Sequence, residues 1–378
     1  MQSIAEKIRD EIATAGAIPF ARFMETALYC PNCGYYEKKK DIGRSGDFHT
    51  SVSVGPLFGA LLAQKFSAWL EGIPAGRHPP VIAEAGAHDG TLAADILTSL
   101  HTHHPELFGK IEFRIIEPSP QRRAWQRKTL AAFENKVRWT EDLSGLTNHG
   151  AADGGRAFCG IIFSNELLDA FPVHRLGWDG ARKLWFEWGV AVNGDRFVWT
   201  RLSAAPVLPE WVRLLPPALL DALPEGCAIE VCPAAEQWWR RAAAILHQGW
   251  LLTADYGLNE DEILSPCRPH GTLRGYFRHH LADDILERPG EQDITAHVNF
   301  TALERAGGLA GLVTEFSGSQ SKFLTEIFAR AFHDGRLSGW SRAQTRQFQT
   351  LIHPEHMGGA FRVLAQRRDS DKINRVET

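Results

Sequence analysis

The 378-residue sequence lacks several features that would assign it to a specialised class of protein. Its six cysteines are too few and too scattered for a disulfide scaffold. A formal net charge of −4 gives no broad basic field, which argues against nucleic acid as a partner. No apolar run approaches the roughly 18 residues of a membrane span, so we expect no membrane-spanning segment. With 44% hydrophobic and 23% charged residues, the composition is that of a globular protein.

The sequence also predicts no metal site. Cys30 and Cys33 form one C-x-x-C pair, but a zinc site would need a second pair, and none follows at short spacing. No strand pattern precedes the pair, as a thioredoxin-like redox motif would require. A reduced turn at these two cysteines is therefore favoured, with metal binding or redox chemistry as the alternative.

The N-terminal residues do not have the pattern of a targeting segment. Residues 1–8 are amphipathic and include the acidic Glu6, unlike a secretory signal or a transit peptide. On this basis we expect a cytoplasmic protein.

Apolar and amphipathic segments alternate along much of the chain, which predicts a largely parallel sheet with right-handed crossovers. We expect strands at 81–85, 112–117, 136–139, 158–164, 250–255, 312–316 and 361–366, and helices at 4–16, 19–28, 91–101, 120–133, 233–247 and 322–332. The expected organisation is an N-terminal helical cap and loop at 1–75, an α/β core at 76–172 and 229–368, an inserted α+β subdomain at 173–228 and a tail at 369–378. The aromatic-rich insertion is a candidate homodimer or substrate surface.

The most informative stretch is an apolar run at 81–85 that leads through Gly86 and Gly90 into an amphipathic segment. A strand, a tight turn and a helix start in this order hold nucleotide-like cofactors in doubly wound α/β folds. About 25 residues further on, a second strand pattern ends at Glu117, a spacing that suits hydrogen bonds to both hydroxyls of a ribose. His88 stands where a dinucleotide motif needs a glycine. The pattern predicts a nucleoside cofactor, with an ordinary βα turn as the alternative.

Another polar group of residues follows the predicted strand at 158–164. It contains Asn165, Glu166 and Asp169, and in a parallel sheet this strand end faces the same crevice as Gly86. Because Glu166 and Asp169 are three residues apart, one helical turn would point both carboxylates to one side. Two carboxylates beside a cofactor can hold a cationic group, align it and accept a proton. The alternative is that they cap or solvate a loop.

Several long motifs, taken in order, resemble one known family. They lie at 43–51, 56–59, 164–173, 254–257, 271–276, 293–300 and 353–358. The segments at 271–276 and 293–300 have local alternatives, a turn and the N-cap of a helix beginning at Thr301. In this order the motifs resemble the MidA-like family of S-adenosylmethionine-dependent methyltransferases, which includes a mitochondrial complex I assembly factor known as a protein arginine methyltransferase. The resemblance covers about residues 18 to 367.

The resemblance implies a Rossmann-like class I methyltransferase sheet and S-adenosyl-L-methionine as cofactor. It implies that Glu117 takes the ribose, that Asp142 pairs with the adenine amino group, and that a loop before residue 51 folds over the cofactor. The residues carried over to cofactor binding are Glu84, Gly86, Gly90, Glu117, Asp142, Gly46, Asp47 and Thr50. Asn165 would line the methyl-transfer crevice, and Glu166 and Asp169 would face the acceptor.

The predicted function is therefore methylation of arginine in a protein acceptor, such as a respiratory-complex subunit. The cofactor turn departs from the Gly-Pro-Gly-x-Gly of the family because this chain has Ala87 and His88 there. His88 favours an alternative, a non-catalytic assembly chaperone or binding protein that retains a cofactor pocket. An NAD-dependent oxidoreductase is disfavoured by the missing glycine. The family also has other residues in place of the Cys30 and Cys33 pair.

Overall fold

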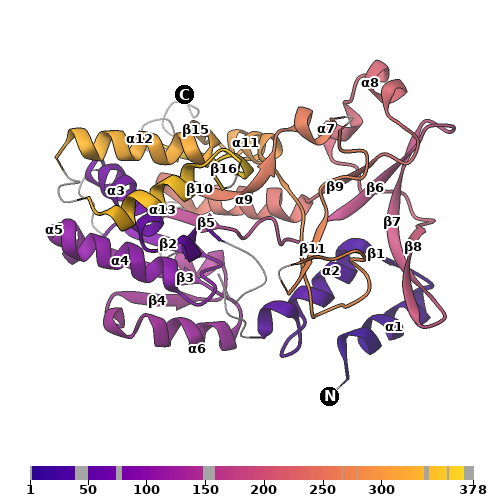
Figure 1. Cartoon of the computed structure of the whole chain (residues 1–378), viewed down its shortest axis with the longest axis horizontal. Helices are drawn as coiled ribbons and strands as arrows, with labels where there is room; N and C mark the ends of the chain where they lie inside the picture. Colours follow the sequence, from indigo (N-terminus) through magenta and orange to yellow (C-terminus); the bar gives the residue numbers. More distant parts are fainter. Residues whose placement is uncertain are drawn as a thin grey trace. The chain divides into compact units, whose positions relative to one another are not determined.

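The computed structural model resolves into two compact units, which we describe separately (Figure 1). Unit 1 comprises residues 1–48, 168–237 and 257–303, and unit 2 comprises 49–167, 238–256 and 304–378. The structure describes residues 2–38, 50–73, 79–147, 158–265, 267–278, 280–335, 340–355 and 357–369. Within these ranges, no helix combines the length and the apolar character needed to cross a membrane.

Unit 2 is built on a mostly parallel sheet with the strand order β15-β16-β10-β5-β2-β3-β4. The strands are β2 (Val81–Ala85), β3 (Glu112–Ile116), β4 (Val137–Thr140), β5 (Phe158–Asn165), β10 (Leu246–Leu258), β15 (Val313–Ser319) and β16 (Phe361–Arg368). Strands β4, β3, β2, β5 and β10 are parallel, and β16 is antiparallel to both β10 and β15. The chain fills one side of β2 with β3 and β4 and then continues on the other side with β5. The strand order therefore reverses between β2 and β5, the position at which open α/β sheets bind ligands.

Helices bury their apolar stripes against this sheet. Phe58, Leu61, Leu62 and Phe66 on α3 (Leu57–Glu71) are buried in one hydrophobic core with α4 (Thr91–His103), α12 (Gln320–His333) and residues of β2, β5, β10 and β16. Further helices assigned to unit 2 are α5 (Pro105–Lys110), α6 (Pro120–Thr129), α13 (Arg342–Ile352) and α14 (Met357–Ala360), with short 3-10 turns η2 (Val52–Val54), η3 (Ala131–Phe133) and η4 (Leu143–Leu146). Helices α9 (Pro233–Ile245) and α11 (Phe300–Leu309) contribute residues to both units. The apolar spacing of α3 thus reflects core packing.

Unit 1 contains a five-stranded antiparallel sheet with the order β1-β7-β6-β9, in which β8 pairs with β7. Its strands are β1 (Ile18–Pro19), β6 (His174–Asp179), β7 (Leu184–Asn193), β8 (Arg196–Arg201) and β9 (Ala228–Val231). Helix α1 (Ile4–Ala15) starts with a capping box between Ser3 and Glu6 and buries Ile4, Ile8 and Ile12. Helix α2 (Phe20–Tyr29) and the 3-10 turn η1 (Tyr35–Glu37) complete the N-terminal part.

A second, three-stranded sheet of unit 1 joins two of the sequence motifs. Strand β11 (Arg274–Phe277) pairs antiparallel with β12 (His280–Leu281) and with β13 (Asp293–Thr295). The short β14 (Val298–Asn299) pairs with the end of β10 at Gly257 and Leu258. Helices α7 (Glu210–Arg213), α8 (Pro217–Ala222) and α10 (Glu260–Ile263) lie in the connections.

The predicted α/β class is confirmed, and most expected elements agree with the structure within a few residues. The largest difference in a strand is β10, which begins at Leu246 and not at residue 250. The compact units divide the chain differently from the four predicted segments. Strand β6 of the expected insertion pairs with β9, and β7 pairs with β1, so the sheet extends beyond residues 173–228 at both sequence ends. The four-segment division itself stays a prediction.

Candidate functional site

The parallel register of unit 2 brings several predicted site residues to one edge of the sheet. Ala85 of β2 is paired with Ile116 of β3 on one side and with Ser164 of β5 on the other. The residues that follow these three, Gly86, Glu117 and Asn165, therefore lie at the same edge of the sheet, with Asn165 as the last residue of β5. This edge lies at the reversal of strand order between β2 and β5.

The turn after β2 depends on three residues with positive φ: Gly86 at 73°, His88 at 44° and Gly90 at 88°. A Cβ atom on Gly86 would lie 2.7 Å from Cδ1 of Leu167, so the turn also passes close to the segment after β5. The Gly90 amide donates to the Ala87 carbonyl at 2.7 Å and closes the turn before α4 begins. Glycine at 86 and 90 is needed because other residues adopt this backbone region with strain.

His88 occupies this turn without a glycine. Its carbonyl accepts a hydrogen bond from Nε2 of Gln126 at 3.0 Å. Its Nδ1 lies 3.8 Å from Oδ1 of Asp89, and its ring centroid lies 6.4 Å from that of Trp125. Histidine is among the residues that enter the left-handed region more readily than most. The structure therefore accommodates His88 between Asp89 and α6.

Two acidic residues flank the turn and have opposite electrostatic environments. Glu84 is only 2% exposed, and Oε2 is buried with no hydrogen-bond partner among the described residues. Burial and then the negative charge of Asp89 raise the pKa of Glu84 to about 8. Burial also acts to raise the pKa of Asp89, but the nearby His88 ring and the hydrogen bonds from Thr91 outweigh it and lower that pKa to about 2. A cationic group placed beside Glu84 would supply the missing partner and favour the ionised carboxylate.

Glu117, the predicted ribose ligand, is buried in a hydrogen-bond network. Its Oε1 accepts from the Ser119 amide at 2.9 Å and from Nε of Arg122 at 2.9 Å. Its Oε2 accepts from Nε2 of Gln126 at 3.3 Å. A carboxylate oxygen has two lone pairs, so Oε2 retains capacity for a hydroxyl donor. The geometry fits a ribose contact, which stays a prediction.

The other predicted cofactor contacts have local hydrogen bonds in this structure. Asp142 is exposed and accepts from the Ser144 amide at 2.8 Å and from the Ser144 hydroxyl at 2.5 Å, which caps η4 and lowers its pKa. Thr50 is buried, and its hydroxyl accepts from the Ser53 amide at 3.0 Å. Their contacts to adenine and to the cofactor stay predictions. Gly46 and Asp47 lie outside the described residues.

The end of β5 holds a carboxylate in a defined position. Oε1 of Glu166 accepts from Nδ2 of Asn165 at 3.0 Å and from the backbone amide of Ser51 at 3.1 Å. Glu166 has a φ of 50°, and its own amide donates to the Ala254 carbonyl at 3.0 Å. The prediction of a helical turn over residues 166–169 is wrong, because this segment consists of bends and a turn. Positive φ at Glu166 is incompatible with a right-handed helical turn.

Asp169 belongs to unit 1 and has separate local contacts. It is 5% exposed, and its carbonyl accepts from the Ala296 amide at 2.9 Å. Its charge contributes, after burial and the charge of Asp293, to a strongly raised pKa at Tyr36. The Tyr36 hydroxyl donates to Oδ1 of Asp293 at 2.7 Å. Asp169 thus lies in a buried acidic and aromatic environment that its sequence position alone does not indicate.

Three buried residues of unit 2 hold the predicted site residues in place. None of the three had a role predicted from the sequence. Asp255 is fully buried, and its carboxylate accepts from the amides of Leu167 and Tyr256 at 3.1 and 2.9 Å. Gln126 joins Glu117 to the turn at His88, and Ser51 supplies the amide that holds Glu166. Ser51 and Asp255 lie within the family motifs at 43–51 and 254–257 but had no predicted role, and the isolated Gln126 has no sequence pattern that would mark it.

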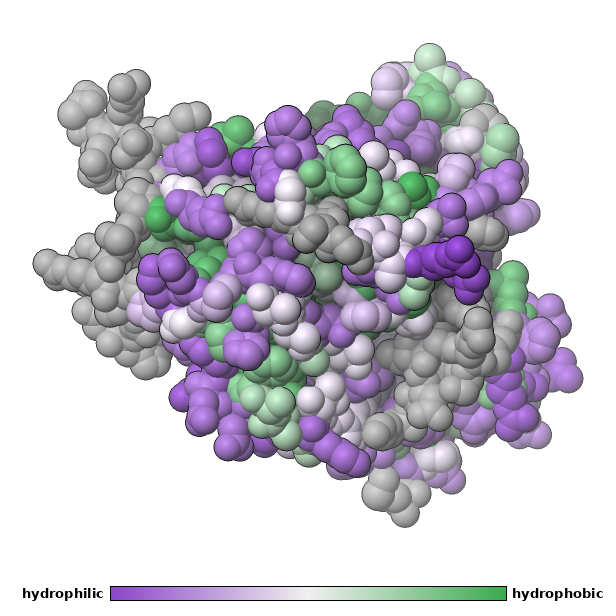
Figure 2. All heavy atoms as spheres, turned by 60° about the vertical axis from the view of Figure 1, so that its left-hand side comes forward, coloured by the Kyte–Doolittle hydropathy of each residue, from purple (hydrophilic) through white to green (hydrophobic). Residues whose placement is uncertain are grey.

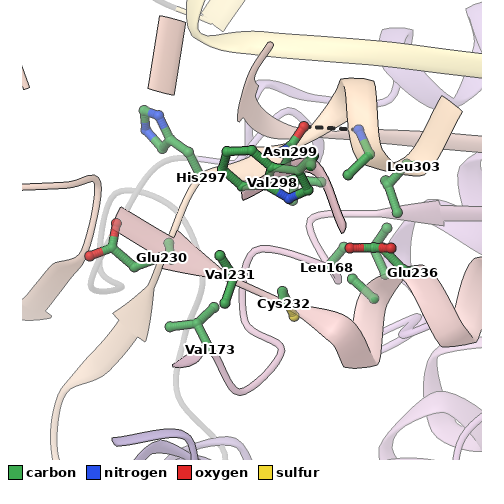
Figure 3. A pocket seen from close by; sticks show the side chains of 14 residues that line it. Leu168, Val173, Glu230, Val231, Cys232, Glu236, His297, Val298, Asn299 and Leu303 are labelled. Atoms are coloured by element: carbon green, nitrogen blue, oxygen red, sulfur yellow. Dashed lines mark hydrogen bonds between the residues drawn. The ribbon is translucent and has the colours of Figure 1, made fainter. Parts of the chain in front are cut away.

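Unit 1 contains a small cavity of about 20 Å³, room for about one water, beside β9 and β14 (Figure 3). Its lining includes Glu230, Cys232, His297 and Asn299. Oε2 of Glu230 accepts from the amide and hydroxyl of Thr272 at 2.6 and 3.0 Å. The hydroxyl of Thr272 in turn accepts from the His297 amide at 3.0 Å. These bonds join the motifs at 271–276 and 293–300 into one structural unit.

The polar side chains of this cavity have different roles. Asn299 accepts from the Ala302 amide at 2.9 Å (Figure 3), so the N-cap alternative for residues 293–300 is confirmed, with the helix beginning at Phe300 and not at Thr301. Burial, followed by the positive charges of Arg274 and Arg268, lowers the pKa of His297 to about 4, so its imidazole is neutral at pH 7. Nδ1 of His297 is buried with no hydrogen-bond partner among the described residues.

Curated relatives match over almost the whole chain. One relative is the Danio rerio protein named "Protein arginine methyltransferase NDUFAF7, mitochondrial". The two sequences are 28% identical, and the match covers 98% of this chain and 90% of the relative. The sequence is 30% identical to the Mus musculus protein of the same name, over 78% of this chain and 67% of that one. The Drosophila melanogaster homolog is 28% identical over 96% of this chain and 84% of its own length.

The expectation of a cytoplasmic protein is wrong by this comparison, because the names of these relatives place them in mitochondria. The structure gives the physical reason why the N-terminal pattern misled. The amphipathic spacing of Ile4, Ile8 and Ile12 serves the packing of α1 in unit 1, and Glu6 completes its capping box. Neither feature reports a cellular compartment.

Solved structures give the same assignment. A COG1565 superfamily member from Burkholderia thailandensis bound to S-adenosyl-homocysteine matches with a TM-score of 0.79 and 32% identity, over 97% of this chain and 92% of that one. A native structure of a COG1565 superfamily protein from the same organism gives a TM-score of 0.77 at 33% identity, over 97% and 91% of the two chains. Residues 61–317 match the family described as "Putative S-adenosyl-L-methionine-dependent methyltransferase". The chain therefore belongs to this family, a family of enzymes with S-adenosyl-L-methionine as cofactor.

Proposed function

We propose that this S-adenosyl-L-methionine-dependent methyltransferase transfers the methyl group to an arginine side chain of a protein, such as a subunit of a respiratory complex. Relatives that match over most of both chains carry the name protein arginine methyltransferase, which supports arginine as the acceptor. The observation that carries the proposal is the Glu166 carboxylate, which two N–H donors hold at the sheet edge that also bears the Gly86 turn.

Arginine needs such a carboxylate because its guanidinium is protonated in water, with a pKa of about 12.5 or above. The positive charge is delocalised over three nitrogens, which makes each of them a poor nucleophile. A carboxylate paired with two of these nitrogens localises the charge there and leaves the third nitrogen directed at the methyl group. Alignment of nucleophile and methyl group accounts for most of the catalysis in an in-line displacement.

Glu166 is positioned for this role before any acceptor binds. Its Oε1 is held by the Asn165 amide group and the Ser51 backbone, while its backbone has the strained φ of 50°. Strained backbone of this kind costs about 1–3 kcal/mol and persists only where the surrounding structure enforces it. In this proposal Glu166 binds the guanidinium and Asn165 orients Glu166, while a role of Asp169 toward the acceptor stays a separate prediction.

The residues at the sheet edge where β2 and β3 end fit the cofactor. S-adenosyl-L-methionine supplies an electrophilic methyl group on a sulfonium when it is bound. Oε2 of Glu84 is buried with no hydrogen-bond partner in the described part of the chain and suits the cationic methionine part, and Oε2 of Glu117 has capacity for a ribose hydroxyl. Gly86 and Gly90 shape the turn. Asp142 for the adenine, and Thr50 with Gly46 and Asp47 for the covering loop, complete the proposed contacts.

Substitution of Glu166 by glutamine tests the proposal directly. The glutamine Oε1 can still accept from Asn165 and Ser51, so the change removes mainly the charge. We expect Glu166→Gln to abolish methylation of an arginine-containing protein acceptor, detected as methylarginine by mass spectrometry, while the affinity for S-adenosyl-L-methionine stays within about threefold. The control is Glu112→Gln, a carboxylate at the opposite end of β3 that pairs with Arg114 at 3.0 Å. Unchanged turnover in Glu166→Gln would remove Glu166 from the mechanism.

His88 in the cofactor turn favours a second candidate, an assembly chaperone that keeps the cofactor pocket without catalysis. Calorimetric titration with S-adenosyl-L-methionine distinguishes the two, since a chaperone of this kind would show no binding at millimolar cofactor.

The homodimer stays a prediction as well. Figure 2 shows polar and apolar residues intermixed over the face that it presents, and the exposed large apolar side chains of the described chain are scattered over both units.

A further inference from the structure

Cys30, Cys33 and Lys7 form a compact cluster in unit 1. The sulfur atoms of Cys30 and Cys33 are 3.1 Å apart, and Cys33 donates to Cys30. Nζ of Lys7, on α1, lies 3.0 Å from Sγ of Cys30 and 3.7 Å from Sγ of Cys33. All three residues are partly exposed.

The backbone fixes the two cysteines at this distance. Helix α2 ends at Tyr29, and the carbonyl of Cys30 accepts from the amides of Cys33 and Gly34 at 3.1 and 2.7 Å. Asn32 has a φ of 64°, which closes the turn. A Cβ atom on Gly34 would lie 2.5 Å from the Leu28 carbonyl oxygen, so the turn is packed tightly against the end of α2. A disulfide bond of about 2.05 Å would require the sulfurs to approach by only about 1 Å.

The electrostatics distinguish the two thiols. Cys30 receives two donors, the Lys7 ammonium and the Cys33 thiol, and both stabilise a thiolate on Cys30. The hydrogen bond and charge of Cys30 raise the pKa of Lys7, so Lys7 stays protonated. Burial and then the hydrogen bond with Cys30 raise the pKa of Cys33. This asymmetry makes Cys30 the nucleophile and Cys33 the resolving thiol.

We propose that Cys30 and Cys33 form a reactive dithiol site that exchanges with low-molecular-weight disulfides of the glutathione type, with Lys7 activating Cys30. The proposal goes beyond the methyltransferase function and does not depend on it. It takes up the redox alternative to a reduced turn, because the sequence spacing did not show the lysine that lies against the sulfur. Within the described residues, no group of three or more His, Cys, Asp or Glu side chains is placed to hold a metal ion.

The exchange balances in two steps. The Cys30 thiolate attacks one sulfur of the external disulfide, forms a mixed disulfide and expels the other half as a thiolate. Cys33 then loses its proton to solvent, and its sulfur attacks Sγ of Cys30 and expels the second thiolate. From the Cys30 thiolate and the Cys33 thiol, the protein loses two electrons and one proton, and the external disulfide gains the two electrons and leaves as two thiolates, one of which can take up the released proton.

The site can be tested on the full chain with glutathione disulfide, followed by alkylation of remaining thiols and peptide mass spectrometry. We expect an internal disulfide between Cys30 and Cys33 to form at least tenfold faster than Cys267, the exposed cysteine, takes up glutathione. In Cys33→Ser the mixed disulfide should accumulate on Cys30 with one glutathione per chain. In Cys30→Ser, Cys33 should react no faster than Cys267.

Lys7 variants test the activation. Removal of the Lys7 ammonium, 3.0 Å from Sγ of Cys30, takes away the nearest positive charge and one hydrogen-bond donor of a Cys30 thiolate. We therefore expect Lys7→Met to slow the first step about threefold at pH 7, and Lys7→Arg to retain the rate. Circular dichroism would verify that the variants are folded. The proposal is overturned if Cys30 reacts no faster than Cys267, or if both cysteines are glutathionylated without forming an internal disulfide.

Discussion

The substitution Glu84→Gln should make the protein more stable at alkaline pH, because Glu84 is a buried carboxylate with no charge partner among the described residues. In the folded protein burial and Asp89 raise its pKa to about 8, compared with an ordinary value of 4.5. The folded state thus binds the proton more tightly than the unfolded state. The free energy of unfolding therefore falls as the pH rises from about 4.5 to about 8, because the unfolded chain releases this proton first.

The size of the effect follows from the two pKa values. At 1.36 kcal/mol per pKa unit, a change from 4.5 to about 8 corresponds to a loss of up to about 5 kcal/mol for the wild-type protein. Glu84→Gln does not titrate and should not lose this stability. We expect the variant to gain several kcal/mol relative to wild type between pH 5 and pH 9, measured by urea denaturation at fixed pH values.

Two further measurements make the prediction specific. Glu112→Gln removes a partly exposed carboxylate that is already paired with Arg114, so its difference from wild type should stay nearly constant over the same pH range. Addition of the cationic cofactor should lower the pKa of Glu84 in the wild type, so affinity should rise towards pH 8 and this rise should be absent in Glu84→Gln. If the free energies of unfolding of wild type and Glu84→Gln differ by a constant amount between pH 5 and pH 9, the reasoning is refuted.

Two other predictions concern the turn after β2 and the cavity of unit 1. Gly86→Ala should lower stability by about 2–3 kcal/mol in thermal denaturation, because alanine is strained at a φ of 73° and its Cβ would meet Leu167 at 2.7 Å. Gly109→Ala, which has open space around its Cβ position, should instead be neutral or stabilising, and equal losses in both variants would contradict the turn argument. The pKa of His297 is lowered to about 4 from 6.5, so the wild type should lose up to about 3 kcal/mol as the pH falls through this window. His297→Gln should remove this loss of stability at acid pH. If the variant and the wild type have the same acid unfolding profile, His297 is not the cause of the loss.

Local sequence signals were reliable for the elements that carry the cofactor turn. The apolar run at 81–85 is buried on every residue, which is why it was recognisable as a central parallel strand. The glycines at 86 and 90 both have positive φ, so their identity reported the turn geometry directly. By contrast, β1 has only two residues, and its pairing with β7 depends on a distant segment. No local pattern can indicate such a strand.

The candidate site was partly accessible to sequence reasoning. The alternation of strands and helices places four candidate residues at or near strand ends: Glu84, Glu117, Asn165 and Glu166. Some of their partners do not follow from this alternation, because several of the hydrogen bonds join residues that are far apart in the chain. Ser51 and Glu166 are 115 positions apart, and Leu167 and Asp255 are 88 positions apart. The helical turn predicted for 166–169 failed for the same reason, since the contact with β10 imposes a different backbone.

The sequence by itself determined the α/β class, the strand-turn-helix at the cofactor edge and, through its long motifs, the methyltransferase family. These depend on hydrophobic periodicity and on residues whose backbone requirements are local. Only the tertiary structure decided the charge states and the neighbours: the raised pKa of Glu84, the fixed carboxylate of Glu166, and the lysine beside Cys30. The physical reason is that desolvation and hydrogen bonding depend on which distant segments surround a group, and the chain must be folded before these surroundings exist.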